Sequence, residues 1–443
     1  MCIVEEMSET FQMLSSDLPN RGHHFTPNSN EIIKREYFIQ NIDLHFEQNS
    51  KKAFCLYGQS GSGKSTIVLD YATENLAKNK NLVARWIQCD TYENLYINFI
   101  QKLLNIFFSH NLKNFLKNKN KSAIIEILNN KLKNLDNDLL FIFVNLKPEK
   151  THLKELFQMI VASMPQNVKI LITSRNKIES LDCMEVRLFD HKKASEFVNI
   201  YLGDDKRQIV DFGPFEENLI SQAYLPLNVL KMVSYAKHFE LKIGANQLEI
   251  CGGPIKRIME DLFVNFEHDK QLITYIAFLD GHFIQKDLIQ SLTNLSDNFL
   301  IESINRLEKC FLIKSGDYNE YESFGFSLHP DVHSIIRHFV EEKIEKNIKT
   351  LIYSNLIEKF CGEIKADLEL DRMYDSNSID KLKHIKKFLK LFKDCDNKSE
   401  QTKFKQAQIH EYLAQLYENI FLNNEYALKY YLKAVEYFKK VNI

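Results

Sequence analysis

The sequence predicts an α/β region followed by an all-α region, and three observations support this fold class. Four short apolar runs alternate with helical patterns between residues 53 and 173, at the spacing that a parallel, doubly wound sheet requires. A glycine-rich loop joins the first of these runs to a helix. After residue 190 the apolar residues recur mainly at helical spacing, and the 443-residue chain contains only 13 glycines and 8 prolines.

The chain begins with residues 1–30, which are polar and aperiodic and are predicted to form a flexible arm. From Glu31 the apolar residues recur mostly at steps of three and four, so a helix is expected up to about Phe46. The first strand, residues 53–57, follows directly. The α/β region is therefore assigned to residues 31–190.

The loop after the first strand has the spacing G-x-x-x-x-G-K-S. It reads Gly58-Gln59-Ser60-Gly61-Ser62-Gly63-Lys64-Ser65-Thr66. Glycines at this spacing let successive backbone N–H groups point at a phosphate, because a Cβ atom would block the required conformations. The start of the next helix adds its N–H groups and its dipole. We expect Lys64 to reach the β- and γ-phosphates of a nucleoside triphosphate and the Ser65 hydroxyl to bind Mg²⁺.

The remaining strands are expected at residues 82–89, 139–144 and 168–173, with a short edge strand at 184–188. A helix is expected at residues 151–162, between the third and fourth strands. Strands and helices that alternate in this way predict a parallel sheet with helices on both faces.

The chain beyond residue 190 is predicted to divide into three helical parts. Residues 191–252 form a helical extension with Pro226 at the start of a helix, where its missing N–H group is tolerated. Residues 253–345 contain three helical patterns and then two short strands, at 310–314 and 324–328, around a polar turn. This order resembles a winged helix.

Residues 346–443 are predicted to form a helical tail. Between residues 405 and 440, small and aromatic residues fall at nearly the positions of a tetratricopeptide unit: Leu413, Ala414, Tyr417, Ala427, Tyr431 and Ala434. The gap between Tyr417 and Ala427 is one residue longer than the usual pattern. One such unit cannot bury its own face, so either residues 350–393 supply neighbouring helices or a protein partner covers it.

Composition argues against several classes of protein. With 57 basic and 59 acidic residues, the net charge of −2 gives no overall field to attract nucleic acid or anionic membrane. Eight cysteines are scattered singly, which predicts neither a disulfide framework nor a zinc site and fits a reducing compartment. No apolar run has the length of a membrane-spanning helix. The sequence therefore predicts a cytoplasmic protein without a transmembrane segment or a nucleic-acid partner.

The ordered set of parts resembles the NB-ARC branch of the STAND nucleotide switches. The resemblance rests on the phosphate loop, Arg85-Trp86-Ile87, Ile172-Thr173-Ser174-Arg175, Leu225-Pro226-Leu227, the winged-helix pattern and the tetratricopeptide-like tail. It implies ATP or ADP with Mg²⁺ as ligands and a sensor role for Arg175 at the γ-phosphate. It also implies ADP contacts by Arg35, which lies in Lys34-Arg35-Glu36, by Pro226 and by His329. The alternatives are a surface ion pair for Arg175, a helix-start proline for Pro226 and an uninvolved histidine at position 329.

One departure from this family concerns the end of the third strand. The family has an acidic residue there, which holds the Mg²⁺ shell and helps to position the attacking water. In this sequence that position falls at Val144 or Asn145, depending on register, and neither is a carboxylate. Its loss should weaken phosphoryl transfer, so ATP hydrolysis is expected to be slow or absent. Glu149 could substitute if its loop folds back.

The leading hypothesis is an ADP/ATP-binding regulatory switch that relays a signal through its C-terminal helices. A protein partner is expected on these helices, and ATP is expected to permit homo-oligomer formation. Two other classes remain open. One is an interaction scaffold that holds its nucleotide permanently. The other is a winged-helix DNA-binding ATPase, which is disfavoured because residues 298–307 carry no dense basic run.

Overall fold

The computed structural model describes most of the chain from residue 35 to residue 441, and every structural statement below concerns these residues. They are 35–48, 52–89, 95–96, 99–100, 121–165, 168–196, 210–211, 225–229, 243–244, 253–318, 323–369, 376–392 and 399–441, without residues 134, 136, 166, 167, 191, 195, 282, 311 and 422. The predicted arm, residues 1–30, lies outside them. The chain divides into two compact units, and the first includes residues 32–194 and 224–227. Each unit is described by itself.

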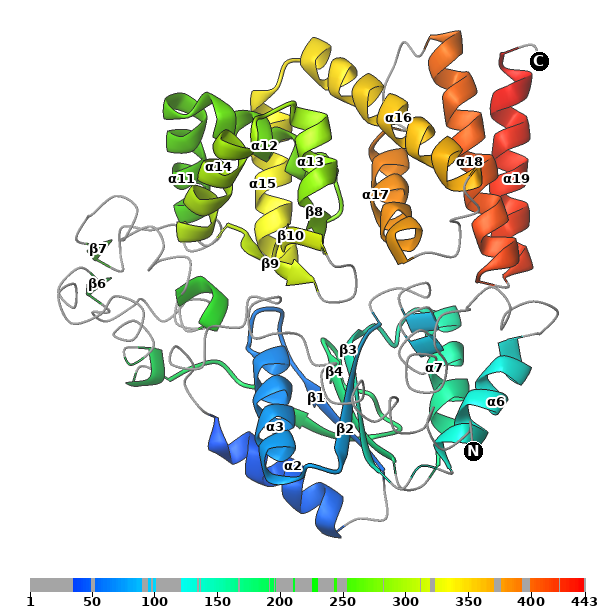
Figure 1. Ribbon diagram of the computed structural model, residues 1–443. Coiled ribbons are helices and arrows are strands. Elements are labelled where there is room, and N and C mark those ends of the chain that lie inside the picture. The colour runs from blue at the N-terminus through cyan, green and yellow to red at the C-terminus, as the bar shows by residue number, and fades with distance from the viewer. Residues whose placement is uncertain are drawn as a thin grey trace, which may run out of the picture. The chain divides into compact units, whose positions relative to one another are not determined.

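The first unit is built on a parallel sheet of five strands in the order β2-β3-β4-β1-β5 (Figure 1). Its strands are β1 (Ala53–Tyr57), β2 (Leu82–Gln88), β3 (Asp138–Leu146), β4 (Val168–Ser174) and β5 (Asp182–Glu185). All neighbouring pairs run parallel. The predicted parallel P-loop sheet is thus confirmed, and its central strands are largely apolar because both faces are covered.

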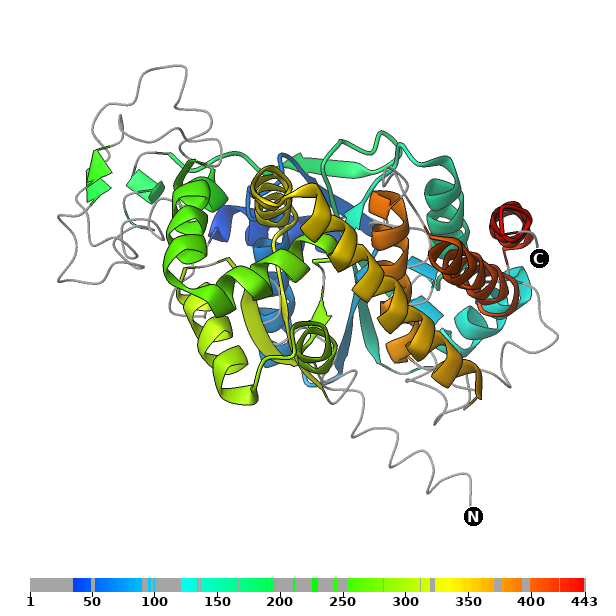
Figure 2. The same cartoon turned by 90° about the horizontal axis from the view of Figure 1, so that it is seen from above.

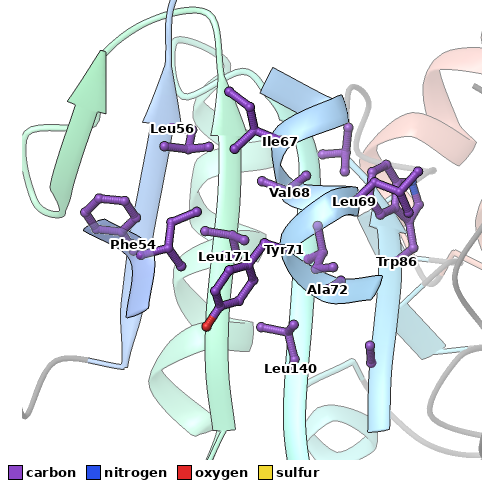
Figure 3. Close-up of a cluster of buried hydrophobic side chains, with 14 of the residues drawn as sticks. Phe54, Leu56, Ile67, Val68, Leu69, Tyr71, Ala72, Trp86, Leu140 and Leu171 are labelled. Carbon is purple, nitrogen blue, oxygen red and sulfur yellow. The ribbon is translucent and has the colours of Figure 1, made fainter. Parts of the chain in front are cut away.

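Helices cover the two faces of this sheet. On one face, α2 (Glu36–Gln48) and α3 (Lys64–Lys78) enclose a cluster that includes Phe54, Val68 and Leu140 (Figure 3). On the other face, α7 (Thr151–Ser163) places Phe157 edge-on to Phe143, with 5.2 Å between the ring centres. Next to α7 lies α6 (Lys121–Leu132). On β3, Leu140 therefore faces the first cluster and Phe143 faces α7, because successive strand side chains point to opposite faces of the sheet.

The edge strand differs from its expected position. It was expected at residues 184–188, but β5 spans Asp182–Glu185, two residues earlier. The reason is its pairing: β5 matches β1 from Phe54 with Asp182 to Tyr57 with Glu185, and β1 ends there. Beyond the strand, the Val186 N–H group donates to the Tyr57 carbonyl at 2.7 Å, and the chain then turns toward the loop that follows β1.

The second unit contains five helices between residues 253 and 343: α11 (Gly253–Asn265), α12 (Glu267–Phe278), α13 (Lys286–Thr293), α14 (Asp297–Lys309) and α15 (Pro330–Lys343). Four of them precede the hairpin, where three were expected. α11 and α12 are separated by Phe266 alone, in an extended conformation with φ −136° and ψ 97°.

A small antiparallel sheet accompanies these helices, with β8 (Ile284–Gln285), β9 (Lys314–Tyr318) and β10 (Ser323–Ser327) in the order β8-β10-β9. The first hairpin strand was expected at residues 310–314, but it begins at Lys314. The Leu312 N–H group donates to the Leu307 carbonyl at 3.0 Å, so this apolar segment closes the end of α14. Leu312 and Ile313 are buried there without strand pairing.

The tail consists of α16 (Lys346–Glu369), α17 (Ser376–Phe392), α18 (Glu400–Asn419) and α19 (Asn424–Lys439), so the predicted helical tail is confirmed. α18 and α19 lie side by side in both views (Figure 1 and Figure 2). Leu413, Ala414, Tyr417, Ala427 and Ala434 are buried, as a repeat-like packing of the two helices requires. The assignment of this hairpin as a tetratricopeptide unit stays a prediction.

The predicted helical extension, residues 191–252, lies largely outside the described residues. Within it the structure describes two short paired strands, β6 (Val210–Asp211) and β7 (Ile243–Gly244), and residues 225–229. Among the helices that the structure describes, none has both the length and the apolar character needed to cross a membrane.

Candidate phosphate-binding site

The loop between β1 and α3 is shaped by its glycines. Gly58 has φ 147° and Gly61 has φ 79°, in the region that side chains other than glycine rarely adopt. A Cβ atom on Gly58 would lie 2.8 Å from the Val186 carbonyl oxygen, and one on Gly61 would lie 2.7 Å from the Leu227 Cβ atom. Both contacts are too close, so these two positions require glycine. The loop therefore passes close to two other segments of the chain, at Val186 and at Leu227.

Backbone hydrogen bonds hold this loop against its neighbours. Gly58 donates its N–H group to the Ser174 carbonyl of β4 at 3.2 Å. The Gly61 carbonyl accepts from the N–H group of Leu227 at 3.3 Å, and the Gly63 carbonyl accepts from Ile67 at 3.0 Å. α3 begins directly after Gly63, so the first N–H groups of the helix have no partner within the helix. The loop and this helix end together form an anion-binding geometry.

Lys64 is buried in this loop, with 6% of its surface exposed. Its Nζ atom donates to the carbonyl oxygens of Gly58 at 2.8 Å and Gln59 at 2.7 Å, and it lies 3.4 Å from the Ser62 hydroxyl. The ammonium group is thus held within the loop, and the charge is compensated by oxygens of the loop itself. Ser65 and Thr66 follow in the first turn of α3 and are partly exposed.

Arg175 follows the end of β4 and is exposed. Because β4 pairs in parallel with β1, the carboxyl ends of both strands meet at one edge of the sheet. There the Nη2 atom of Arg175 lies 3.4 Å from the Ser60 hydroxyl, which accepts a hydrogen bond. The structure thus brings this predicted residue to the loop, although 115 positions separate it from Ser60.

Arg35 precedes α2 and is buried beside the same loop. Its guanidinium lies over the Phe189 ring at 4.6 Å, and its Nη1 atom donates to the Arg187 carbonyl at 3.2 Å. A Cβ atom on Gly63 would lie 3.9 Å from Cζ and 4.0 Å from Nη2 of this arginine. The buried Nη2 atom has no hydrogen-bond partner among the residues that the structure describes. Burial lowers the pKa of Arg35 to about 10, which still leaves it charged at neutral pH.

Pro226 lies in a short segment that reaches the loop from far along the chain. The neighbouring residue Leu227 bonds to Gly61, as described above, and Leu225 packs on the same side of the loop. Pro226 itself is partly exposed at the start of a helical turn. The predicted Leu-Pro-Leu turn is therefore part of the loop's surroundings.

His329 belongs to the second unit and caps α15. Its Nδ1 atom accepts a hydrogen bond from the Asp331 N–H group at 3.2 Å, and Pro330 occupies the first helical position. This local role is that of an N-cap residue. Its predicted contact with ADP stays a prediction.

The two candidate positions for the missing acid, Val144 and Asn145, lie near the end of β3 in different surroundings. Val144 is buried in the apolar cluster under α3. Asn145 has φ 61° at an irregularity of the strand, and its N–H group donates to the Thr173 hydroxyl at 3.0 Å. Neither candidate position offers a carboxylate, and which of the two corresponds to the acidic position stays a prediction. Glu149 is exposed in the turn beyond.

Several residues around the loop were not found by sequence reasoning. Val186, Arg187 and Phe189 follow the edge strand and supply the contacts to Gly58 and Arg35, and Thr173 fixes the Asn145 backbone. No local pattern marks them, because their roles depend on which strands are neighbours. In the part of the chain that the structure describes, no group of three or more His, Cys, Asp or Glu residues could hold a metal ion.

Comparisons with known proteins found only solved structures of low sequence identity among the matches described below. No protein-family model and no curated protein matches this chain. The chain is similar to the crystal structure of a Signal Transduction ATPase with Numerous Domains (STAND) protein with a tetratricopeptide repeat sensor from Pyrococcus horikoshii, at 15% identity and a TM-score of 0.44. That likeness covers 97% of this chain and 66% of the other, so this chain spans just under two thirds of its length.

Two further solved structures are also similar to this chain. Cdc6p from Pyrobaculum aerophilum has 13% identity and a TM-score of 0.34 over 76% of this chain and 99% of its own. ORC1 from Aeropyrum pernix in complex with DNA has 11% identity and a TM-score of 0.37 over 75% and 96%. Likenesses this remote carry no conclusion about ligand or partner. By its own strand order and loop geometry, the chain is a P-loop α/β protein with a helical C-terminal part.

Proposed function

We propose that this protein binds ATP or ADP at residues 58–66 and acts as a regulatory switch of the STAND type. The observation that carries the proposal is the loop itself. Gly58 and Gly61 cannot hold a side chain, and Lys64 is buried with its ammonium group held at the N-terminus of α3. A buried cation at a helix N-terminus is the arrangement that recognises a polyphosphate.

In this proposal, different residues around the loop bind different parts of the nucleotide. Lys64 exchanges its loop carbonyls for phosphate oxygens, and the Ser65 hydroxyl holds the Mg²⁺ that accompanies the nucleotide. Mg²⁺ neutralises charge on the phosphates when it is bound. Arg35 offers its unpartnered Nη2 donor beside Gly63, and Arg175 offers an exposed guanidinium at Ser60. Pro226 provides an apolar contact for the base.

ATP hydrolysis is slow or absent in this proposal. Val144 and Asn145, the two candidates for the position where a carboxylate would organise the metal shell, are not acids, and the Asn145 N–H group is bonded to the Thr173 hydroxyl. An amide neither accepts a proton from the attacking water nor balances the charge of Mg²⁺. Nucleotide identity, and not turnover, then sets the state of the switch.

The switch works through differential affinity for its two states. ADP favours a closed state that includes a contact by His329, whereas ATP or a protein partner on the C-terminal helices favours association. A ligand shifts such an equilibrium only by the ratio of its affinities for the two states. A scaffold with a permanently bound nucleotide is the competing function.

The test is the identity and amount of nucleotide released by acid from freshly purified protein. We expect a stoichiometric amount from the wild type and none from Lys64→Ala. Lys78→Ala, at the exposed end of the same helix, is the matched control and should keep its nucleotide. A wild-type protein that is empty and fails to bind added ATP and ADP contradicts the proposal. A nucleotide that never exchanges, even with partner present, favours the scaffold.

A further inference from the structure

α19 presents two different faces. Ala427 and Ala434 are buried toward α18, and the Tyr437 hydroxyl accepts a hydrogen bond from Gln406 of that helix at 3.1 Å. In contrast, Leu428, Leu432 and Val435 are 59%, 62% and 47% exposed. Spacings of four and three residues place these three on one side of the helix.

This alignment sets α19 apart from the other described helices. Large exposed apolar residues occur elsewhere singly or in pairs, for example Phe299 and Ile301 on α14 and Ile348 and Leu351 on α16. Scattered exposed residues of this kind are normal on a protein surface, whereas an aligned apolar strip marks a contact site.

Charged residues complete the strip at both ends. Glu425 lies seven residues before Leu432, and Lys439 lies seven residues after it, so both continue the same face. We call the set Glu425, Leu428, Leu432, Val435 and Lys439 the α19 stripe. It is acidic at its N-terminal end, apolar in the middle and basic at its C-terminal end.

The charge order selects the partner and its direction. Two copies of α19 that cross at Leu432 in antiparallel orientation place Glu425 of each copy at the level of Lys439 of the other. A parallel arrangement would instead place like charges together, which is unfavourable.

We propose that the α19 stripe is a self-association surface through which two copies of this chain pair antiparallel. The inference does not depend on nucleotide binding. α19 has 16 residues and is about 24 Å long. A contact of this length buries less than the roughly 1,200 Å² of a stable complex. The pairing is therefore weak and depends on concentration.

The first experiment is sedimentation velocity of the full chain from about 1 to about 200 μM. We expect a reversible monomer–dimer equilibrium in the wild type and a dissociation constant at least about tenfold higher for Leu432→Asp, because burial of a carboxylate is costly. Leu351→Asp, on the equally exposed α16 residue, is the control and should associate like the wild type. Circular dichroism confirms that each variant is folded.

Charge exchange tests the orientation. Glu425→Lys alone and Lys439→Glu alone should each weaken association about fivefold, and the double variant should restore it to within about twofold. The two positions lie 14 residues apart, about 21 Å along the helix, so restoration cannot arise within one copy. A monomeric wild type, unchanged association in Leu432→Asp, or a double variant no better than the singles would each overturn the proposal.

Discussion

Two arginines lie at the same loop in opposite environments. Arg35 is buried, stacked on Phe189 and bonded to a backbone carbonyl, whereas Arg175 is exposed and makes a single 3.4 Å contact with Ser60. A buried guanidinium has already lost its water, so its remaining donor gains more from a ligand than an exposed one does. Arg35 is therefore suited to bind the nucleotide in every state, whereas Arg175 is suited to a response that depends on which phosphates are present.

The largest effect is expected at the buried arginine. Arg35→Ala should lower ADP affinity about 10- to 100-fold, because a hydrogen bond from a charged donor is worth about 1.5–3 kcal/mol. Calorimetry with ADP measures this. Arg35→Lys keeps the charge but not the two-sided donor geometry, and it should bind with intermediate affinity. Equal affinity of Arg35→Ala and the wild type would remove the distinction between the two arginines.

The second prediction concerns the loop that both arginines contact. Gly61→Ala places a Cβ atom against Leu227 at a positive φ and should reduce the free energy of unfolding by about 1–3 kcal/mol. Gly362→Ala is the matched control. No atom lies within 4 Å of its new Cβ in α16, so it should stabilise the protein by up to about 1 kcal/mol. Urea denaturation measures both, and a tolerated Gly61→Ala would show that the loop is less constrained than we infer.

The third prediction introduces a carboxylate near the end of β3. Asn145→Asp keeps a residue type that accepts positive φ and places an acid at the end of β3. We expect Mg²⁺-dependent ATP hydrolysis to rise about tenfold, since positioned acid–base groups contribute at least that much. Phosphate release under single-turnover conditions is the measurement, with Asn145→Ala as control. An unchanged rate would locate the defect outside this position.

The smallest effect is expected at the exposed arginine. Arg175→Ala should change the free energy of unfolding by less than about 0.5 kcal/mol, because surface contacts of this kind contribute little. If the guanidinium binds the γ-phosphate, the affinity for ATP should fall about threefold while the affinity for ADP stays the same. Titrations with both nucleotides test this, and an equal loss for ATP and ADP would contradict a sensor role.

The sequence by itself determined the sheet strands, the glycine-rich loop and the helical tail. Each of these depends on local pattern: apolar runs form buried strands, and G-x-x-x-x-G-K-S after a strand forms the loop. Its errors are local too. One helix more than expected precedes the hairpin, because Phe266 alone separates α11 from α12. The edge strand begins two residues earlier than expected, because its pairing with β1 sets where it lies.

Only the tertiary structure decided what surrounds the loop. Strand order brings Ser60 to Arg175, places Val186 against Gly58 and sets Arg35 on Phe189. It also buries Val144 in the apolar cluster and bonds the Asn145 N–H group to the Thr173 hydroxyl. Several of these contacts join residues that are more than 100 positions apart in the sequence, and others depend on the register in which neighbouring strands pair. Sequence spacing carries no information about such neighbours, because their distance is fixed by the packing of strands that lie far apart in the chain.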